Sequence, residues 1–128
     1  MSFSNFGSVE HPLAAKVRRA TELVRARRPD LAVDGEMQAD VAVVPELLEG
    51  RFPFTRVKQP NVLIFPGIEA ANVAYKLLQR LGGAETIGPI LLGVNAPIHV
   101  LQAGDSVDEV VSMAAVAAMD AQARGGRR

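Results

Sequence analysis

The chain has 128 residues, 48% of them hydrophobic and 22% charged, which fits one globular domain with a hydrophobic core and argues against disorder throughout. The chain has 14 Lys and Arg residues and 14 Asp and Glu residues. Because its formal net charge is therefore zero, it lacks the positive charge that would attract nucleic acid. Cysteine is absent, which excludes disulfides, thiolate catalysis and cysteine-ligated metal centres and fits the reducing cytoplasm that we expect as its location.

Apolar periodicity and the turn residues predict an alternation of strands and helices. The predicted elements are, in chain order, a strand over 3–7, a helix over 12–28, a strand over 31–33, a short helix over 41–48, a connector over 51–60, a strand over 61–65, a helix over 69–81, a strand over 98–101 and a helix over 106–124. Pro45 either breaks the short helix or begins it.

The two longer helices carry apolar residues at three- and four-residue steps, which predicts a buried face on each. In the helix over 12–28 these are Leu13, Val17, Ala20, Leu23 and Val24. In the helix over 69–81 they are Val73, Leu77, Leu78 and Leu81. The run N-V-L-I-F over 61–65 predicts a strand that is buried on both faces. The alternation as a whole predicts an α/β fold with a largely parallel sheet.

Small polar residues surround the glycine that ends the first predicted strand. Hydroxyl and amide side chains beside a glycine can line an anion pocket, although a polar turn before a helix explains the same composition. These residues are Ser4, Asn5 and Ser8. A second polar stretch, D-G-E-M-Q-A-D over 34–40, holds three carboxylates that suit a metal or acid–base pair, but partner ligands are missing.

Asn72, Lys76 and Arg80 recur at four-residue steps and therefore share one face of their predicted helix. Two cations on one face can bind a phosphate, whereas the spacing alone equally describes a solvated face. The basic residues of the helix over 12–28 scatter around it, which favours a solvated surface.

The junction over 101–109 joins a predicted strand to the last helix. In α/β proteins such junctions commonly carry catalytic groups, yet residues 102–104 offer no nucleophile, base or cation. Ser106 and Glu109 have the spacing of a capping box, in which each side chain bonds the backbone of the other residue. The capping box explains this junction without catalysis.

Six stretches taken together resemble the phosphate acetyl/butyryltransferase family. They follow the family's order: S-F-S-N-F-G-S, D-G-E-M-Q-A-D-V-A, N-V-L-I-F-P, A-A-N-V-A-Y-K-L-L-Q-R-L-G-G-A, I-G-P-I-L-L-G and D-A-Q. The resemblance covers residues 1–122 as the C-terminal portion of a phosphotransacetylase-like domain, with 123–128 as a flexible tail. It implies a three-layer αβα fold with a largely parallel sheet, akin to the isocitrate and isopropylmalate dehydrogenases.

Within that family the chain looks most like the C-terminal phosphotransacetylase-like domain of bacterial malic enzymes. The similarity lies in Asn5-Phe6-Gly7-Ser8 followed by His11-Pro12, in Ala70-Ala71-Asn72, and in the stretch over 97–101. True transferases carry serine and arginine directly after the leucine that matches Leu101. Here those positions hold Gln102 and Ala103. Losing one such charge-stabilising donor costs roughly 3–4 kcal/mol of transition-state stabilisation.

The resemblance therefore implies a degenerate catalytic site and a retained ligand site. The degenerate positions are Gln102, Ala103 and Glu109, the last of which replaces the family's aspartate, and no catalytic residue is expected. The family places cations that match Lys76 and Arg80 near the phosphates of coenzyme A. The expected acyl-CoA or phosphate ligands are Ser4, Asn5, Ser8, Asn72, Lys76 and Arg80.

The function that this resemblance implies is an acyl-CoA-responsive regulatory domain of an NAD(P)-dependent malic enzyme, which decarboxylates malate to pyruvate. Acetyl-CoA is the expected effector, while NAD(P) and a divalent metal belong to the parent's catalytic region, which is outside this chain. The expected partners are that region and further copies in a homodimer or higher homo-oligomer, with neither nucleic acid nor membrane. The alanines of the last helix suit either a dimer interface or internal packing.

Two alternatives stay open. One is an active phosphate acetyltransferase, which converts acetyl-CoA and phosphate into acetyl phosphate and coenzyme A. The other is a truncated protein that folds and associates without a ligand.

Overall fold

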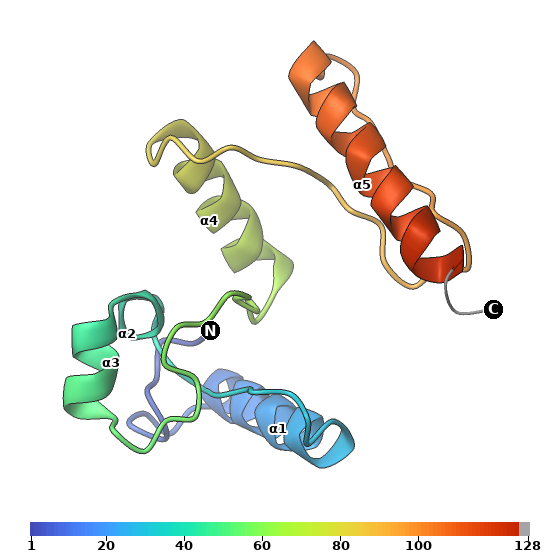
Figure 1. Cartoon of the computed structure of the whole chain (residues 1–128). Coiled ribbons are helices and arrows are strands. Elements are labelled where there is room, and N and C mark those ends of the chain that lie inside the picture. Colours follow the sequence, from blue (N-terminus) through green and yellow to red (C-terminus); the bar gives the residue numbers. More distant parts are fainter. Residues whose placement is uncertain (126–128) are drawn as a thin grey trace. The chain divides into compact units, whose positions relative to one another are not determined.

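The computed structural model describes residues 1–125 and divides into two compact units, Met1–Tyr75 and the unit that starts at Lys76 (Figure 1). The helices are α1 (Pro12–Arg27), α2 (Ala39–Val43), α3 (Pro45–Arg51), α4 (Ile68–Arg80) and α5 (Val107–Gly125). The boundary between the units lies inside α4. Among the described residues, no helix is long and apolar enough to cross a membrane.

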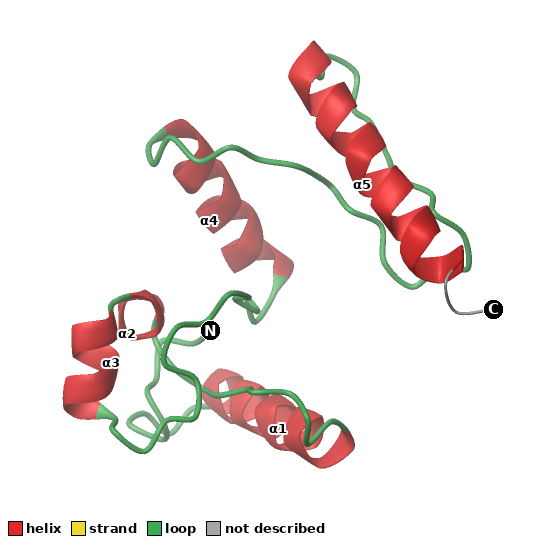
Figure 2. Ribbon diagram, in the orientation of Figure 1, coloured by secondary structure: helices red, strands yellow, loops and turns green. Residues whose placement is uncertain are grey.

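The predicted three-layer αβα fold with a parallel sheet is wrong for this structure, because residues 1–125 contain helices and loops but no strand (Figure 2). A strand needs a neighbouring backbone with which to pair. Within residues 1–125, the segment over 61–65 is hydrogen-bonded to another segment only where the Met1 amine donates to the Ile64 carbonyl, at 2.6 Å. In the segment over 98–101, the Ile98 amide bonds locally to Ala96, at 2.9 Å.

Helix α1 begins and ends as its sequence predicts. The His11 side chain caps the start by accepting a hydrogen bond from the Leu13 amide at 3.2 Å, and Pro12 occupies the first turn. Pro29 follows directly after the C-cap residue. The buried residues, however, are Ala14 and Thr21 rather than the predicted apolar row, and Leu13 is 54% exposed.

The core of the first unit lies where α2 and α3 pack together. It contains Met37, Val41, Ala42 and Leu48. Val44 separates the two helices and Pro45 begins α3, so the proline both interrupts the predicted helix and starts a new one. The Phe6 ring packs against this core and lies 5.0 Å from the Phe52 ring, which attaches the N-terminal loop to α3.

The end of α4 also follows the sequence. The Gly82 and Ala84 amides both donate to the Leu78 carbonyl, at 3.0 and 3.1 Å, and Gly83 takes a left-handed φ of 65° that ends α4. The predicted inward residues of α4 are instead exposed, Leu81 by 82%.

In the second unit, the chain before α5 runs alongside that helix (Figure 1). The Arg124 guanidinium fixes this arrangement by donating to the Val94 carbonyl at 2.7 Å. Helix α5 includes residues 123–125 of the predicted tail, and residues 126–128 lie outside the described part of the chain.

Candidate functional site

The N-terminal loop of the first unit closes around the carboxylate of Glu36, whose side chain is fully buried. One carboxylate oxygen accepts hydrogen bonds from the Ser4 hydroxyl at 2.9 Å, the Gly7 amide at 2.8 Å and the Arg18 guanidinium at 3.0 Å. The other oxygen accepts a second bond from Arg18, also at 3.0 Å. A buried carboxylate thus joins the loop, α1 and the segment before α2.

The backbone of the loop is shaped for this contact. Phe6 has a left-handed φ of 47° and Gly7 a φ of 90°, and this turn directs the Gly7 amide at the carboxylate. The Phe6 amide donates to the Glu36 carbonyl at 2.8 Å, so the loop is bonded to both the backbone and the side chain of one residue. A side chain at position 7 would be strained by this φ, which explains the glycine.

The structure brings Ser4, Asn5 and Ser8 together in one loop. Ser4 is fully buried, and its hydroxyl donates to Glu36 and accepts from the Val9 amide at 3.1 Å. The Asn5 side chain accepts from the Gln38 amide at 2.7 Å, and the Ser8 hydroxyl accepts from the Asn5 amide at 2.9 Å. The amides from residue 4 to residue 9 all have acceptors within the protein.

The pKa of Glu36 follows from this environment. Burial opposes ionisation and raises the pKa. The hydrogen bonds from Arg18, the Gly7 amide and Ser4 outweigh burial and lower the pKa to about 2, against an ordinary value of 4.5. Glu36 is therefore a permanently charged structural anchor at neutral pH and a poor proton acceptor.

The three carboxylates of the stretch over 34–40 do not converge. Asp34 pairs with Arg25 and accepts from the Arg56 amide, which fixes the connector after α3. Asp40 bonds to the Val41 amide at the start of α2. In the described part of the chain, no group of three histidine or acidic side chains is placed to hold a metal ion.

The predicted ligands on α4 are exposed. Asn72 belongs to the first unit, whereas Lys76 and Arg80 belong to the second. The charge of Arg80 lowers the pKa of Glu109, after larger effects from the Ser106 amide and hydroxyl.

The junction before α5 forms the predicted capping box. The Ser106 amide donates to the Glu109 carboxylate at 2.7 Å, and the Glu109 amide donates to the Ser106 hydroxyl at 3.3 Å. The Gln102 amide donates to Asp105 at 2.7 Å, across a turn in which Gly104 has a φ of 98°. Gln102 and Ala103 are exposed in this turn. The Gln102 and Ser106 amides of the junction thus bond the chain's own carboxylates.

His99 is a buried polar residue that the sequence did not single out for function. Its side chain is 4% exposed, and neither ring nitrogen has a hydrogen-bond partner within the described residues. One nitrogen lies 3.5 Å from the Asp120 carboxylate, which also accepts from Arg124 at 2.7 Å. The sequence indicates Glu36 only as one member of an acidic stretch over 34–40. No periodic pattern marks either residue as buried, because each is buried by segments distant in the sequence.

Comparison with known proteins decides the family. The profile described as phosphate acetyl/butaryl transferase matches residues 1–118. The chain belongs to this family. The resemblance that the six sequence stretches predicted is thereby confirmed.

Relatives in the family include proteins of two kinds. The phosphate acetyltransferase of Acetivibrio thermocellus is 44% identical over 123 residues, which are 95% of this chain and 37% of that protein. The NADP-dependent malic enzyme of Escherichia coli strain K12 is 45% identical over 125 residues, which are 95% of this chain and 16% of that protein. These identities do not separate the two kinds.

A solved structure is similar to the chain in fold. The crystal structure of a phosphotransacetylase from Streptococcus pyogenes aligns with a TM-score of 0.88 and 42% identity, over 94% of this chain and 37% of that one. The chain thus spans well under half the length of the transferases that it matches, and a smaller share of the malic enzymes.

The Glu36 contacts predict a large loss of stability in a conservative variant. We expect Glu36→Gln to lower the free energy of unfolding by about 3 kcal/mol, because it breaks a buried ion pair whose guanidinium is partly solvated. Urea unfolding followed by circular dichroism measures the change. The control is Glu22→Gln, which removes an exposed ion pair between Glu22 and Arg19 within α1. It should lower the free energy of unfolding by less than about 1 kcal/mol. Equal losses would contradict the role given to Glu36.

The same carboxylate predicts a pH dependence with a definite sign. Because the pKa of Glu36 is lowered to about 2 from 4.5, its contribution is complete above pH 4.5 and is lost as the pH falls through 2. We expect the difference in unfolding free energy between wild type and Glu36→Gln to shrink by about 3 kcal/mol over that range. Unfolding curves at several pH values test this, and a difference that stays constant would refute it.

Proposed function

We propose that this chain is a catalytically degenerate, acyl-CoA-responsive regulatory part of an NAD(P)-dependent malic enzyme. The observation that carries the proposal is the junction after Leu101, where the resemblance implies serine and arginine and the chain has Gln102 and Ala103. Neither replacement supplies a cation or a nucleophile. The Gln102 and Ser106 amides bond Asp105 and Glu109, which favours a structural turn over a site for a reacting phosphate.

Glu109 also supports a structural role for the junction. The hydrogen bonds from the Ser106 amide and hydroxyl lower the pKa of the Glu109 carboxyl. A carboxylate with a lowered pKa is a weaker general base at neutral pH. Glu109 therefore serves the start of α5 rather than proton transfer in a transferase reaction.

Acetyl-CoA is the effector that we propose for this domain. Lys76 and Arg80 are exposed cations on α4, where the family resemblance implies contact with the phosphates of coenzyme A. Asn72 precedes Lys76 by one helical turn on the same helix and is also exposed. If acetyl-CoA binds one quaternary state more tightly than another, it shifts the protein toward that state and changes the rate of malate oxidation. The coupling free energy between the two sites would be about 1–3 kcal/mol.

The partners that we propose are the malic-enzyme catalytic region, which would carry NAD(P) and the divalent metal, and further copies of the protein. The match to only 16% of the Escherichia coli malic enzyme supports a role as one part of a larger protein. An exposed row of small and apolar residues on α5 supports self-association. This row includes Val107, Val111, Ala114, Ala118 and Ala121.

An active phosphate acetyltransferase is the second candidate. The 44% identity to the Acetivibrio thermocellus enzyme and the similarity in fold to a phosphotransacetylase favour it. This candidate requires another residue to stabilise the negative charge that the missing arginine would stabilise.

Calorimetric titration with acetyl-CoA tests the regulatory proposal. We expect saturable binding to the wild-type chain and affinity at least about tenfold weaker in the double variant Lys76→Ala/Arg80→Ala, because two cations facing phosphate are lost. The control, Arg27→Ala/Lys58→Ala, removes two other exposed cations and should leave the affinity unchanged.

Two outcomes would overturn this proposal. Absence of heat and of a thermal shift with wild type would favour a protein that associates without this ligand. Unchanged affinity in Lys76→Ala/Arg80→Ala would remove both residues from the site.

A further inference from the structure

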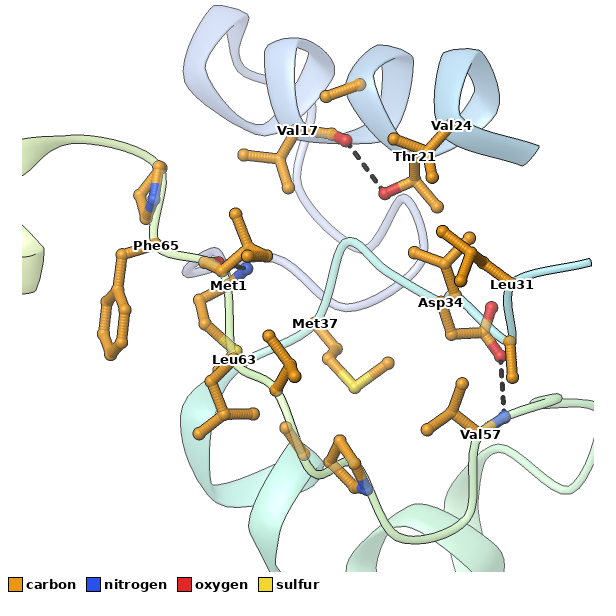
Figure 3. Close-up of a pocket in the computed structure, with 18 of the residues that line it drawn as sticks. Met1, Val17, Thr21, Val24, Leu31, Asp34, Met37, Val57, Leu63 and Phe65 are labelled. Atoms are coloured by element: carbon orange, nitrogen blue, oxygen red, sulfur yellow. Dashed lines mark hydrogen bonds between the residues drawn. The ribbon is translucent and has the colours of Figure 1, made fainter. Parts of the chain in front are cut away.

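A hollow of about 360 Å³ lies in the first unit between α1, the turn at Phe6 and Gly7, and the segment at Gly35 and Glu36. Its volume is in the range of sites that bind small molecules. Thr21 of α1 lines both this hollow and a larger cavity with mostly apolar walls, which Figure 3 shows. The hollow differs from that cavity in the charged side chains that surround it.

Three charged side chains of α1 line the hollow in the order cation, anion, cation. Arg18, Glu22 and Arg25 are spaced four and three residues apart, so they form one row along the helix. Each of these side chains is at least 36% exposed. A ligand in the hollow can therefore reach all three.

Internal contacts hold the two arginines in place and leave part of each guanidinium unbonded. The Nε and Nη2 atoms of Arg18 both donate to Glu36, at 3.0 Å. The Nε atom of Arg25 donates to the Val33 carbonyl at 3.2 Å, and its Nη2 atom donates to Asp34. Within residues 1–125, neither Nη1 atom makes a hydrogen bond. Two fixed cations thus retain N–H groups for an anionic group.

Glu22 retains an acceptor in the same way. Its Oε2 atom accepts from Arg19 at 2.9 Å, whereas its Oε1 atom accepts no hydrogen bond within the described part of the chain. This carboxylate lies between the two arginines in the row, so the hollow combines donors for an anion with an acceptor for a cation.

Two glycines keep space beside this row. A Cβ atom at Gly7 would lie 3.6 Å from the Arg18 guanidinium, and a Cβ atom at Gly35 would lie 3.4 Å from the Thr21 hydroxyl. A larger side chain at either position would enter the hollow. The Phe6 ring supplies the large apolar wall.

We propose that this hollow binds a free α-amino acid with a small apolar side chain. The carboxylate of the ligand accepts from the Nη1 atoms of Arg18 or Arg25, its ammonium donates to Oε1 of Glu22, and its side chain lies against the Phe6 ring. The two charges of an α-amino acid are attached to one carbon atom, which matches the adjacent positions of opposite charge in the row.

The arrangement of charges also selects against simpler ions. A simple anion in the hollow meets the carboxylates of Glu22 and Glu36, and a simple cation meets two guanidiniums. Like charges disfavour both ions, whereas a molecule that carries both charges gains an attraction at each end. None of the residues that line the hollow belongs to the proposed acyl-CoA site, so a failure of either proposal leaves the other standing.

Titration of the isotope-labelled full chain with L-valine tests the site, with NMR shifts recorded at the amides of Gly7 and Gly35. We expect saturable shifts with half-saturation below about 10 mM. Isobutylamine and isovalerate each keep the side chain and only one of the two charges. Each should bind at least about tenfold more weakly than L-valine at neutral pH.

A matched pair of variants locates the ammonium contact. Glu22→Gln removes the negative charge from the row, and Glu49→Gln removes an exposed negative charge on α3, outside the hollow. We expect Glu22→Gln to weaken L-valine binding at least about fivefold and Glu49→Gln to leave it unchanged. Circular dichroism checks that both variants fold, and the two analogues test the proposal on wild type even if Glu22→Gln unfolds.

Three results would overturn the proposal. The first is a lack of saturable shifts at Gly7 and Gly35 with L-valine. The second is equal affinity for L-valine and either analogue, which would identify a surface that binds single ions. The third is unchanged L-valine affinity in a folded Glu22→Gln variant.

Discussion

The buried ion pair between Glu36 and Arg18 is the contact on which the first unit depends. Its carboxylate accepts bonds from α1 and from the N-terminal loop, and the residue that follows it, Met37, enters the core. A charge buried to this extent is tolerated only when its oxygens are fully bonded, and here four donors reach them. The left-handed turn at Phe6 and Gly7 exists to supply one of those donors.

Two internal carboxylates also organise the second unit's junction, where Asp105 accepts from the Gln102 amide and Glu109 from the Ser106 amide. In the N-terminal loop and in this junction, backbone amides are bonded to carboxylates of the chain itself. The junction contains Gln102 and Ala103, and the cations Lys76 and Arg80 on α4 are exposed.

The helices and their ends were predictable from the sequence because they depend on local contacts. Pro12, Pro45 and Gly83 act within one or two turns of their own positions, and the capping box of α5 spans four residues. The sheet was predicted wrongly, because an apolar run such as 61–65 indicates an extended, burial-seeking chain but cannot show that a neighbouring strand is present. The apolar face of α4 likewise indicates a burial-seeking helix but cannot show that a partner covers it, and its leucines are exposed. Ser4, Asn5 and Ser8 lie in one loop, whereas the bond from Ser4 to the distant Glu36 could be found only from the tertiary structure.

The most direct test of the degenerate junction is the rate of acetyl-CoA formation from acetyl phosphate and coenzyme A. The Acetivibrio thermocellus transferase, 44% identical, is the reference. We predict that this chain turns over at least about a hundredfold more slowly, as expected when a charge-stabilising donor is lost. A rate within about tenfold of the reference would contradict the assignment of Gln102 and Ala103 as a degenerate site and establish an active acyltransferase.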